Sequence, residues 1–189
     1  MHRTHLLALL LTCAAAVLPG VSAQASTPEP TLGAALQGQQ PLGTARLRYW
    51  GFDVYDARLF VAPGFDAQRY EDQRFGLELS YLRELKGADI AERSIDEMRD
   101  LAPIEPAQAR RWRAAMGALF PDVQRGDRIT GVHVPGSGAH FYLNGRLLGE
   151  VADAAFSRQF FGIWLSPKTS QPRLREAMLQ APGGPPRTP

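Results

Sequence analysis

Apolar and polar residues alternate along three stretches in the first half of the chain, at residues 45–50, 53–61 and 75–82. Successive side chains of a strand point to opposite faces of a sheet, so this alternation predicts half-buried strands. In the second stretch one face carries Tyr55, Ala57, Leu59 and Val61. We therefore predict three strands, of which the first two are joined around Gly51.

The middle of the chain shows the three- and four-residue spacing of amphipathic helices. We predict one helix from Asp89, as its N-cap, to about Leu101, and a second from near Pro106, where proline suits the first turn. The residues expected to face inward are Ile90, Ile95, Met98 and Leu101 in the first helix, and Trp112, Met116 and Leu119 in the second.

Short apolar and β-branched stretches return in the second half and predict a meander of three strands. These strands cover residues 129–134, 140–143 and 146–151. Residues 135–138 form the first turn. The second turn is Asn144-Gly145, because both residues tolerate the positive φ of a type I′ turn.

Two further helices are predicted after the meander. Asp153 is the expected N-cap of the first, and its apolar face is formed by Phe156, Phe160, Ile163 and Trp164. The last helix covers residues 172–179. Because strands and helices are grouped apart, the order predicts an α+β fold, a curved antiparallel sheet with helices packed on one face.

The N-terminal segment has the organisation of a secretory signal peptide. Arg3 precedes an apolar run over residues 6–17, which is shorter than the roughly 20 residues that span a bilayer. We predict cleavage after Ala23, with Ala25 as the alternative. The mature protein is then expected to be secreted, in a bacterium into the periplasm, without stable insertion in a membrane.

We divide the chain into a signal peptide (1–23), a flexible lead-in (24–40), one domain (41–180) and a disordered tail (181–189). Loss of the leader takes one of the 21 Lys and Arg residues, which leaves 20 against 19 Asp and Glu. This balance, without a polybasic stretch, argues against a nucleic-acid partner. The only cysteine, Cys13, lies in the leader, which excludes disulfides, thiol catalysis and zinc–thiolate sites from the mature protein.

No motif predicts a cofactor, a metal site or a catalytic residue. The Gly-Ser-Gly at residues 136–138 lacks the lysine and the helix start of a phosphate loop, and no serine lies in a nucleophile elbow. His133 and His140 are expected to face each other across a hairpin near Asp127. Their spacing matches no metal-ligand pattern, so we interpret them as ordinary strand residues.

Four stretches, in this order along the chain, resemble the bacterial chalcone isomerase-like family. They are residues 47–61 (LRYWGFDVYDARLFV), 75–98, 120–151 and 156–179. The resemblance implies an open-faced β-sandwich with a ligand cleft between a large antiparallel sheet and a helical layer. Plant enzymes of this fold cyclise chalcones to flavanones, and related plant proteins bind fatty acids, so the fold alone does not decide the function.

The resemblance also implies candidate ligand-binding residues. In the family an arginine of an early strand, helped by a tyrosine, holds an anionic group. Arg46 and Arg48 lie in the corresponding strand, and Tyr55 is the natural second donor; a guanidinium fork pairs well with a carboxylate. Two positions that hold tyrosine and asparagine in the plant enzyme are Ile90 and Glu97 here, and isoleucine can donate no hydrogen bond.

We therefore expect a protein that is not an enzyme and that binds a small amphipathic carboxylate such as a fatty acid. One alternative is an isomerase or lyase acting on an unsaturated carbonyl compound, with Glu97 or Tyr81 as general acid or base. Another is a structural or interaction module of the cell envelope without a small ligand. No particular protein partner follows from the sequence.

Overall fold

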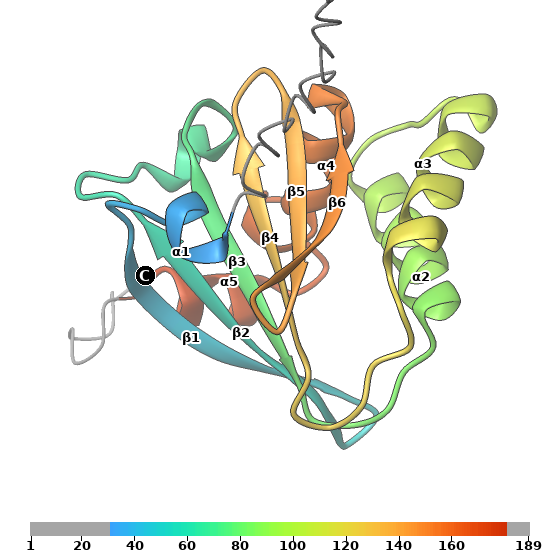
Figure 1. The fold of residues 1–189 in the computed structure, drawn as a ribbon, viewed down its shortest axis with the longest axis horizontal. Coiled ribbons are helices and arrows are strands. Elements are labelled where there is room, and N and C mark those ends of the chain that lie inside the picture. The colour runs from blue at the N-terminus through green and yellow to red at the C-terminus, as the bar shows by residue number, and fades with distance from the viewer. Residues whose placement is uncertain (1–30, 181–189) are drawn as a thin grey trace, which may run out of the picture.

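A computed structural model describes residues 31–180; the predicted signal peptide, the start of the lead-in and the tail lie outside the described residues. At its centre is a six-stranded antiparallel sheet, in which each strand pairs with the next along the chain (Figure 1). The strands are β1 (Gln40–Tyr49), β2 (Phe52–Val61), β3 (Phe75–Tyr81), β4 (Arg128–Val134), β5 (Gly138–Leu143) and β6 (Arg146–Val151).

The four predicted helices are present and form a layer on one side of the sheet (Figure 1). They are α2 (Gly87–Leu101), α3 (Pro106–Leu119), α4 (Ala154–Leu165) and α5 (Pro172–Met178). α4 packs on β4 and β5, α5 packs on β1 and β2, and α2 packs on α3 and α4. The predicted α+β fold is therefore confirmed. Among residues 31–180 no helix is both long and apolar enough to cross a membrane.

The predicted hairpin turn and the predicted N-cap of α4, which both depend on a few neighbouring residues, are confirmed. Asn144 and Gly145 join β5 to β6 with φ of 51° and 87°, as a type I′ turn requires. Asp153 caps α4, because its carboxylate accepts hydrogen bonds from the backbone N–H groups of Ala155 and Phe156 at 2.8 and 3.0 Å. These local geometries fix where β5 ends, where β6 begins and where α4 begins.

The predicted N-cap of α2 is wrong. The helix begins at Gly87, and Asp89 lies inside its first turn. The Gly87 N–H donates instead to the carboxylate of Asp122, 3.0 Å away, which also forms an ion pair of 2.9 Å with Lys86. The hydrogen bonds from Gly87 and Lys86 hold the pKa of Asp122 below its usual range. A partner supplied by a distant loop leaves no mark on the local sequence pattern.

Two short helices were not predicted from the sequence. They are α1 (Leu32–Ala35) and a 3₁₀ helix, η1 (Ala67–Asp72). α1 lies on the face of the sheet opposite the helical layer (Figure 1), where Ala35 packs in a small second core with Val132. Residues 31–40, the end of the predicted flexible lead-in, thus form a helix, a turn and the start of β1. A helix of four residues is too short to show amphipathic periodicity.

The two histidines do not face each other as predicted. The register pairs His133 with Ala139, so His140 points to the opposite face. His133 is buried; its Nε2 donates to the carbonyl of Glu71 at 2.9 Å, and its Nδ1 accepts from the hydroxyl of Ser157 at 2.7 Å. Burial lowers the pKa of His133. Within residues 31–180 no three His, Cys, Asp or Glu side chains are grouped to hold a metal ion.

Candidate functional site

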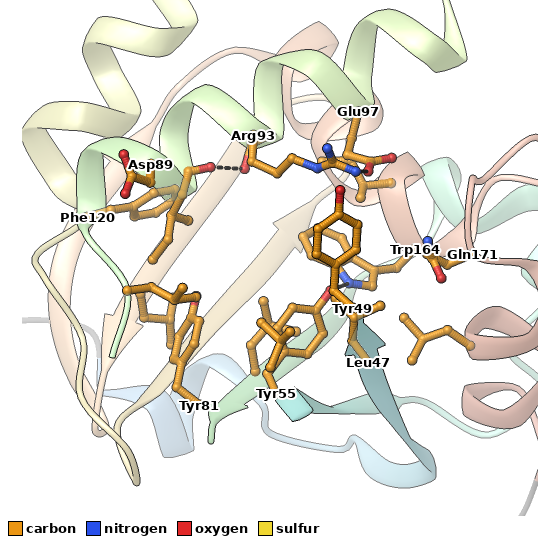
Figure 2. A pocket seen from close by; sticks show the side chains of 18 of the residues that line it. Leu47, Tyr49, Tyr55, Tyr81, Asp89, Arg93, Glu97, Phe120, Trp164 and Gln171 are labelled. Atoms are coloured by element: carbon orange, nitrogen blue, oxygen red, sulfur yellow. Dashed lines mark hydrogen bonds and ion pairs between the residues drawn. The ribbon is translucent and has the colours of Figure 1, made fainter. Parts of the chain in front are cut away.

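A cavity of about 310 Å³ lies between the sheet and the helical layer, where the cleft was expected (Figure 2). The lining residues that belong to the strands or follow β3 are Leu47, Tyr49, Val54, Tyr55, Leu79, Tyr81, Arg83, Leu85 and Ile129. Those from the helices and nearby loops are Asp89, Ile90, Arg93, Ser94, Glu97, Phe120, Phe160, Ile163, Trp164, Ser170, Gln171 and Leu174. Most of this surface is apolar, so the cavity suits a molecule with a hydrocarbon part.

Strand alternation and helix periodicity explain which side chains line the cavity. Leu47 and Tyr49 of β1 point to the helix side, because every second side chain of a strand does so. On α2, Ile90, Ser94 and Glu97 follow one another at spacings of four and three, so they lie on one face of the helix. The two α2 positions named by the family resemblance therefore both reach the cavity.

Two tyrosines supply hydroxyl groups on the sheet side of the cavity. The Tyr55 hydroxyl accepts a hydrogen bond of 3.0 Å from the indole N–H of Trp164, which leaves its own proton for a ligand. Tyr81 is buried, and its ring packs edge-on against Tyr55 with the centroids 6.2 Å apart. Burial raises the pKa of both hydroxyls above the ordinary value, so both stay protonated at neutral pH.

A charged group lies at the α2 edge of the cavity. Glu97 is buried and accepts hydrogen bonds from Arg93 and from the Ser170 hydroxyl, the latter at 2.7 Å. The Arg93 guanidinium also lies 5.6 Å from the ring centroid of Tyr49, within cation–π range. Figure 2 shows Arg93 and Glu97 across the pocket from Tyr55 and Tyr81. Because a guanidinium has five N–H donors, Arg93 can hold Glu97 and a second anion together.

The structure does not bring the predicted arginines into this cavity. Arg46 and Arg48 alternate with the lining residue Leu47, so they point to the opposite face of β1. There Arg46 binds Asp56 through two hydrogen bonds of 2.7 and 2.9 Å. Arg48 binds Asp53 at 2.6 Å, and this hydrogen bond is the main cause that holds the pKa of Asp53 below its usual range. Of the predicted ligand residues, only Tyr55 lines the cavity.

Sequence reasoning missed the two arginines that do line the cavity, Arg83 and Arg93. Arg83 follows β3, and its guanidinium lies 5.6 Å from the ring centroid of Phe52. A signal for Arg93 was present in the sequence, because Arg93 lies one turn from both Ile90 and Glu97 on α2. The cavity arginines thus come from α2 and from the segment after β3, and neither comes from β1.

Comparison with known proteins gives three findings. A family model described as chalcone isomerase-like matches residues 40–180. A protein of Haemophilus influenzae, described only as an uncharacterized protein, is 31% identical over 142 residues, which cover 74% of this chain and 67% of that protein. The crystal structure of a fatty-acid binding protein of Arabidopsis thaliana matches with a TM-score of 0.57 and 12% identity, over 76% of this chain and 87% of that one. An identity this low shows a shared fold alone.

Proposed function

Because the chain belongs to the chalcone isomerase-like family, we propose that it binds a small amphipathic carboxylate, such as a fatty acid, and leaves it chemically unchanged. The observation that carries this proposal is the cavity of about 310 Å³, with an arginine at the edge of a mostly apolar lining. That a fatty-acid binding protein has the same fold supports this class of ligand.

The hydrocarbon part of the ligand lies among side chains such as Leu47, Leu79 and Ile163 in this proposal. Each methylene group removed from water contributes about 0.8 kcal/mol to binding. The volume is near the lower end of the range of about 300–1,000 Å³ for small-molecule sites. A cavity of this size favours one acyl chain over a lipid with two.

The carboxylate of the ligand is held by Arg93 in this proposal. The guanidinium already contacts Glu97 and Tyr49 at the cavity edge, so its side chain is positioned before the ligand arrives. Charge-assisted hydrogen bonds from an arginine to a carboxylate are among the strongest polar contacts in proteins. On the sheet side of the cavity, across from Arg93, the hydroxyl proton of Tyr55 offers the ligand a further hydrogen-bond donor.

The isomerase alternative has weaker support. Its general acid or base is Glu97 or Tyr81, and both line the cavity. However, each carboxylate oxygen of Glu97 already accepts a hydrogen bond, from Arg93 and from Ser170. Tyr81 has a raised pKa, which makes its hydroxyl a poor proton donor near neutral pH. Turnover of a panel of chalcones, lost in Tyr81→Phe and in Glu97→Gln, would establish the alternative.

Export is part of the proposal, and it is supported by the leader-like segment at residues 1–23. The chain is to be expressed with this segment in a bacterium, fractionated, and the intact mass measured. A periplasmic product beginning at Gln24, or at Ser26, is the expected result. A cytoplasmic product of full length would contradict export without affecting the proposed ligand.

Native mass spectrometry of the processed protein tests the function itself. A co-purified mass, identified as a fatty acid after denaturation, is the expected result, and stripped protein should then bind decanoate or palmitate saturably. A clean apo mass together with no saturable binding of either acid would overturn the proposal. In that case the third reading, an envelope module without a small ligand, gains support.

A further inference from the structure

The tip of the β1–β2 hairpin exposes three large aromatic residues. Tyr49, Trp50 and Phe52 are 51%, 83% and 64% exposed, and they are the large hydrophobic side chains that stand out to solvent among the described residues. We name them the aromatic tip. In Figure 1 this hairpin reaches the lower end of the molecule, beside the connections that lead into α2 and out of α3.

The backbone conformation at Trp50 indicates that a tryptophan at this position does not serve folding. Trp50 and Gly51 have φ of 52° and 80°, nearly the values of Asn144 and Gly145 in the other tight hairpin. Asparagine and glycine suit this left-handed geometry, whereas a bulky side chain at positive φ is strained. Strain kept at an exposed position points to function, because an asparagine at residue 50 would fold more easily.

Arginines surround the aromatic tip. A shallow hollow beside it is lined by Arg46, Arg48, Gly51, Phe52, Asp53, Leu82, Arg83 and Arg125. Arg46 is held by Asp53 and Asp56, while Arg83 lies over the ring of Phe52. The nearby carboxylates of Glu84 and Asp122 contact Lys86. Arg48 is paired with Asp53, so the two arginines of the hollow that form no ion pair with a described carboxylate are Arg83 and Arg125, which come from separate chain segments.

From these observations we propose that the aromatic tip docks the protein on the surface of a membrane that contains anionic phospholipid. Tryptophan and tyrosine favour the boundary between headgroups and acyl chains, where the ring is buried and its polar atom stays wet. Arginine near an anionic membrane surface adds electrostatic attraction, which raises the affinity about fivefold per residue. Binding of this kind is peripheral and reversible, and it needs no spanning segment.

A lipid surface fits the aromatic tip better than a protein partner does. A stable protein interface involves about 20–30 residues on each side, whereas the exposed apolar residues here are three side chains on one turn. Three aromatic rings beside guanidinium groups match a bilayer surface, where anionic headgroups lie over apolar acyl chains. Self-association or capture of another protein therefore becomes an outcome that would contradict the proposal.

The aromatic tip is continuous with the cavity. Tyr49 belongs to the tip and lines the cavity, and Arg83 lines both the cavity and the hollow. A docked molecule would hold the edge of the cavity at the bilayer, so a sparingly soluble acyl chain could transfer without crossing water. This role rests on the proposed function, but docking itself does not depend on the ligand.

Flotation with vesicles tests docking on the processed, ligand-free protein. Vesicles of phosphatidylcholine with phosphatidylglycerol should carry the protein, whereas vesicles of phosphatidylcholine alone should carry far less. Trp50 emission should shift to shorter wavelength and become protected from iodide, because the other two tryptophans, Trp112 and Trp164, are buried already. Added salt should weaken binding, since it screens the arginines.

Four variants separate docking from folding and from ligand binding. Trp50→Asn keeps the turn and should lose flotation, and the pair Arg83→Gln and Arg125→Gln should weaken it about tenfold or more. Arg58→Gln, an exposed arginine in the middle of β2, should leave it unchanged. Leu47→Trp, which fills the cavity, should float normally.

Equal flotation on neutral vesicles, full flotation of Trp50→Asn, or no flotation of the wild type would each overturn docking. Self-association of the vesicle-free protein that is lost in Trp50→Asn would also overturn it, because the tip would then be a contact between copies. Failure of docking with saturable decanoate binding intact would leave the proposed function standing. Failure of decanoate binding with flotation intact would remove the ligand and leave the docking surface.

Discussion

The indole N–H of Trp164 donates a hydrogen bond of 3.0 Å to the hydroxyl of Tyr55, although the two residues are 109 positions apart. This bond joins α4 to β2 at the wall of the cavity. Because the same hydroxyl accepts from Trp164 and keeps its own proton, Tyr55 serves the fold and the proposed site together.

Tyr55→Phe should lower the free energy of unfolding by about 1 kcal/mol, because the buried Trp164 N–H loses its acceptor. Urea unfolding followed by circular dichroism measures this change. Tyr81→Phe is the matched control, since it removes a buried hydroxyl from the same wall without removing that acceptor. Equal losses in the two variants would show that the hydrogen bond to Trp164 has no special weight.

Leu47→Trp should block ligand binding, because the larger side chain enters the cavity that Leu47 lines. We expect the affinity for decanoate, measured by calorimetry, to fall at least about tenfold. Thr44→Trp places the same side chain on the exposed face of β1 and should bind as the wild type does. Unchanged affinity in Leu47→Trp would place the ligand elsewhere.

Arg93→Ala should weaken binding of a fatty acid by about 1.5–3 kcal/mol, the usual contribution of a hydrogen bond to a charged group. The methyl ester of the same acid should lose much less, because it has no charge for Arg93 to neutralise. Arg46→Ala should leave both affinities unchanged, since Arg46 points away from the cavity toward Asp56. If Arg46→Ala weakens binding and Arg93→Ala does not, the carboxylate is held on the other face of β1.

Acid should destabilise the fold through His133. The pKa of His133 in the folded protein lies below the ordinary 6.5 because the ring is buried. As the pH falls through this value, the unfolded chain therefore binds a proton at His133 that the native state does not bind. The free energy of unfolding should therefore fall as the pH drops below 6.5, with a slope of at most about 1.4 kcal/mol per pH unit. Measurement above about pH 5 avoids most carboxylate titration.

The control for this slope is a pair of variants. His133→Leu should make the free energy of unfolding nearly independent of pH between about pH 5 and 6.5, although the variant will be less stable overall. His140→Gln, half-buried on the opposite face of the sheet, should retain it. A slope that survives in His133→Leu would assign the acid sensitivity to other groups.

Trp50→Asn should raise the free energy of unfolding by up to about 1 kcal/mol, because it relieves a bulky residue at positive φ. Gly51→Ala should do the reverse, since its φ is 80° and a Cβ there meets open space, so backbone strain acts alone. Thermal unfolding of the two variants measures both effects. A loss of stability in Trp50→Asn would show that the indole is needed for folding.

The sequence by itself determined most of the secondary structure, because its signals act within a few residues. Asn144-Gly145 sets a turn, Asp153 caps its own helix, and alternation defines β2. It also determined that Arg46 and Leu47 lie on opposite faces of one strand. The family resemblance, which joins distant stretches, extended this to the fold and to the existence of a cleft.

Only the tertiary structure decided which face of that strand meets the helices, and so which arginine reaches the cavity. Alternation has two equivalent orientations, and the choice depends on which face is covered by residues far along the chain. For the same reason the cap from Asp122, the bond between Trp164 and Tyr55 and the arginines around the aromatic tip have no local signature. Each joins segments that only folding brings together.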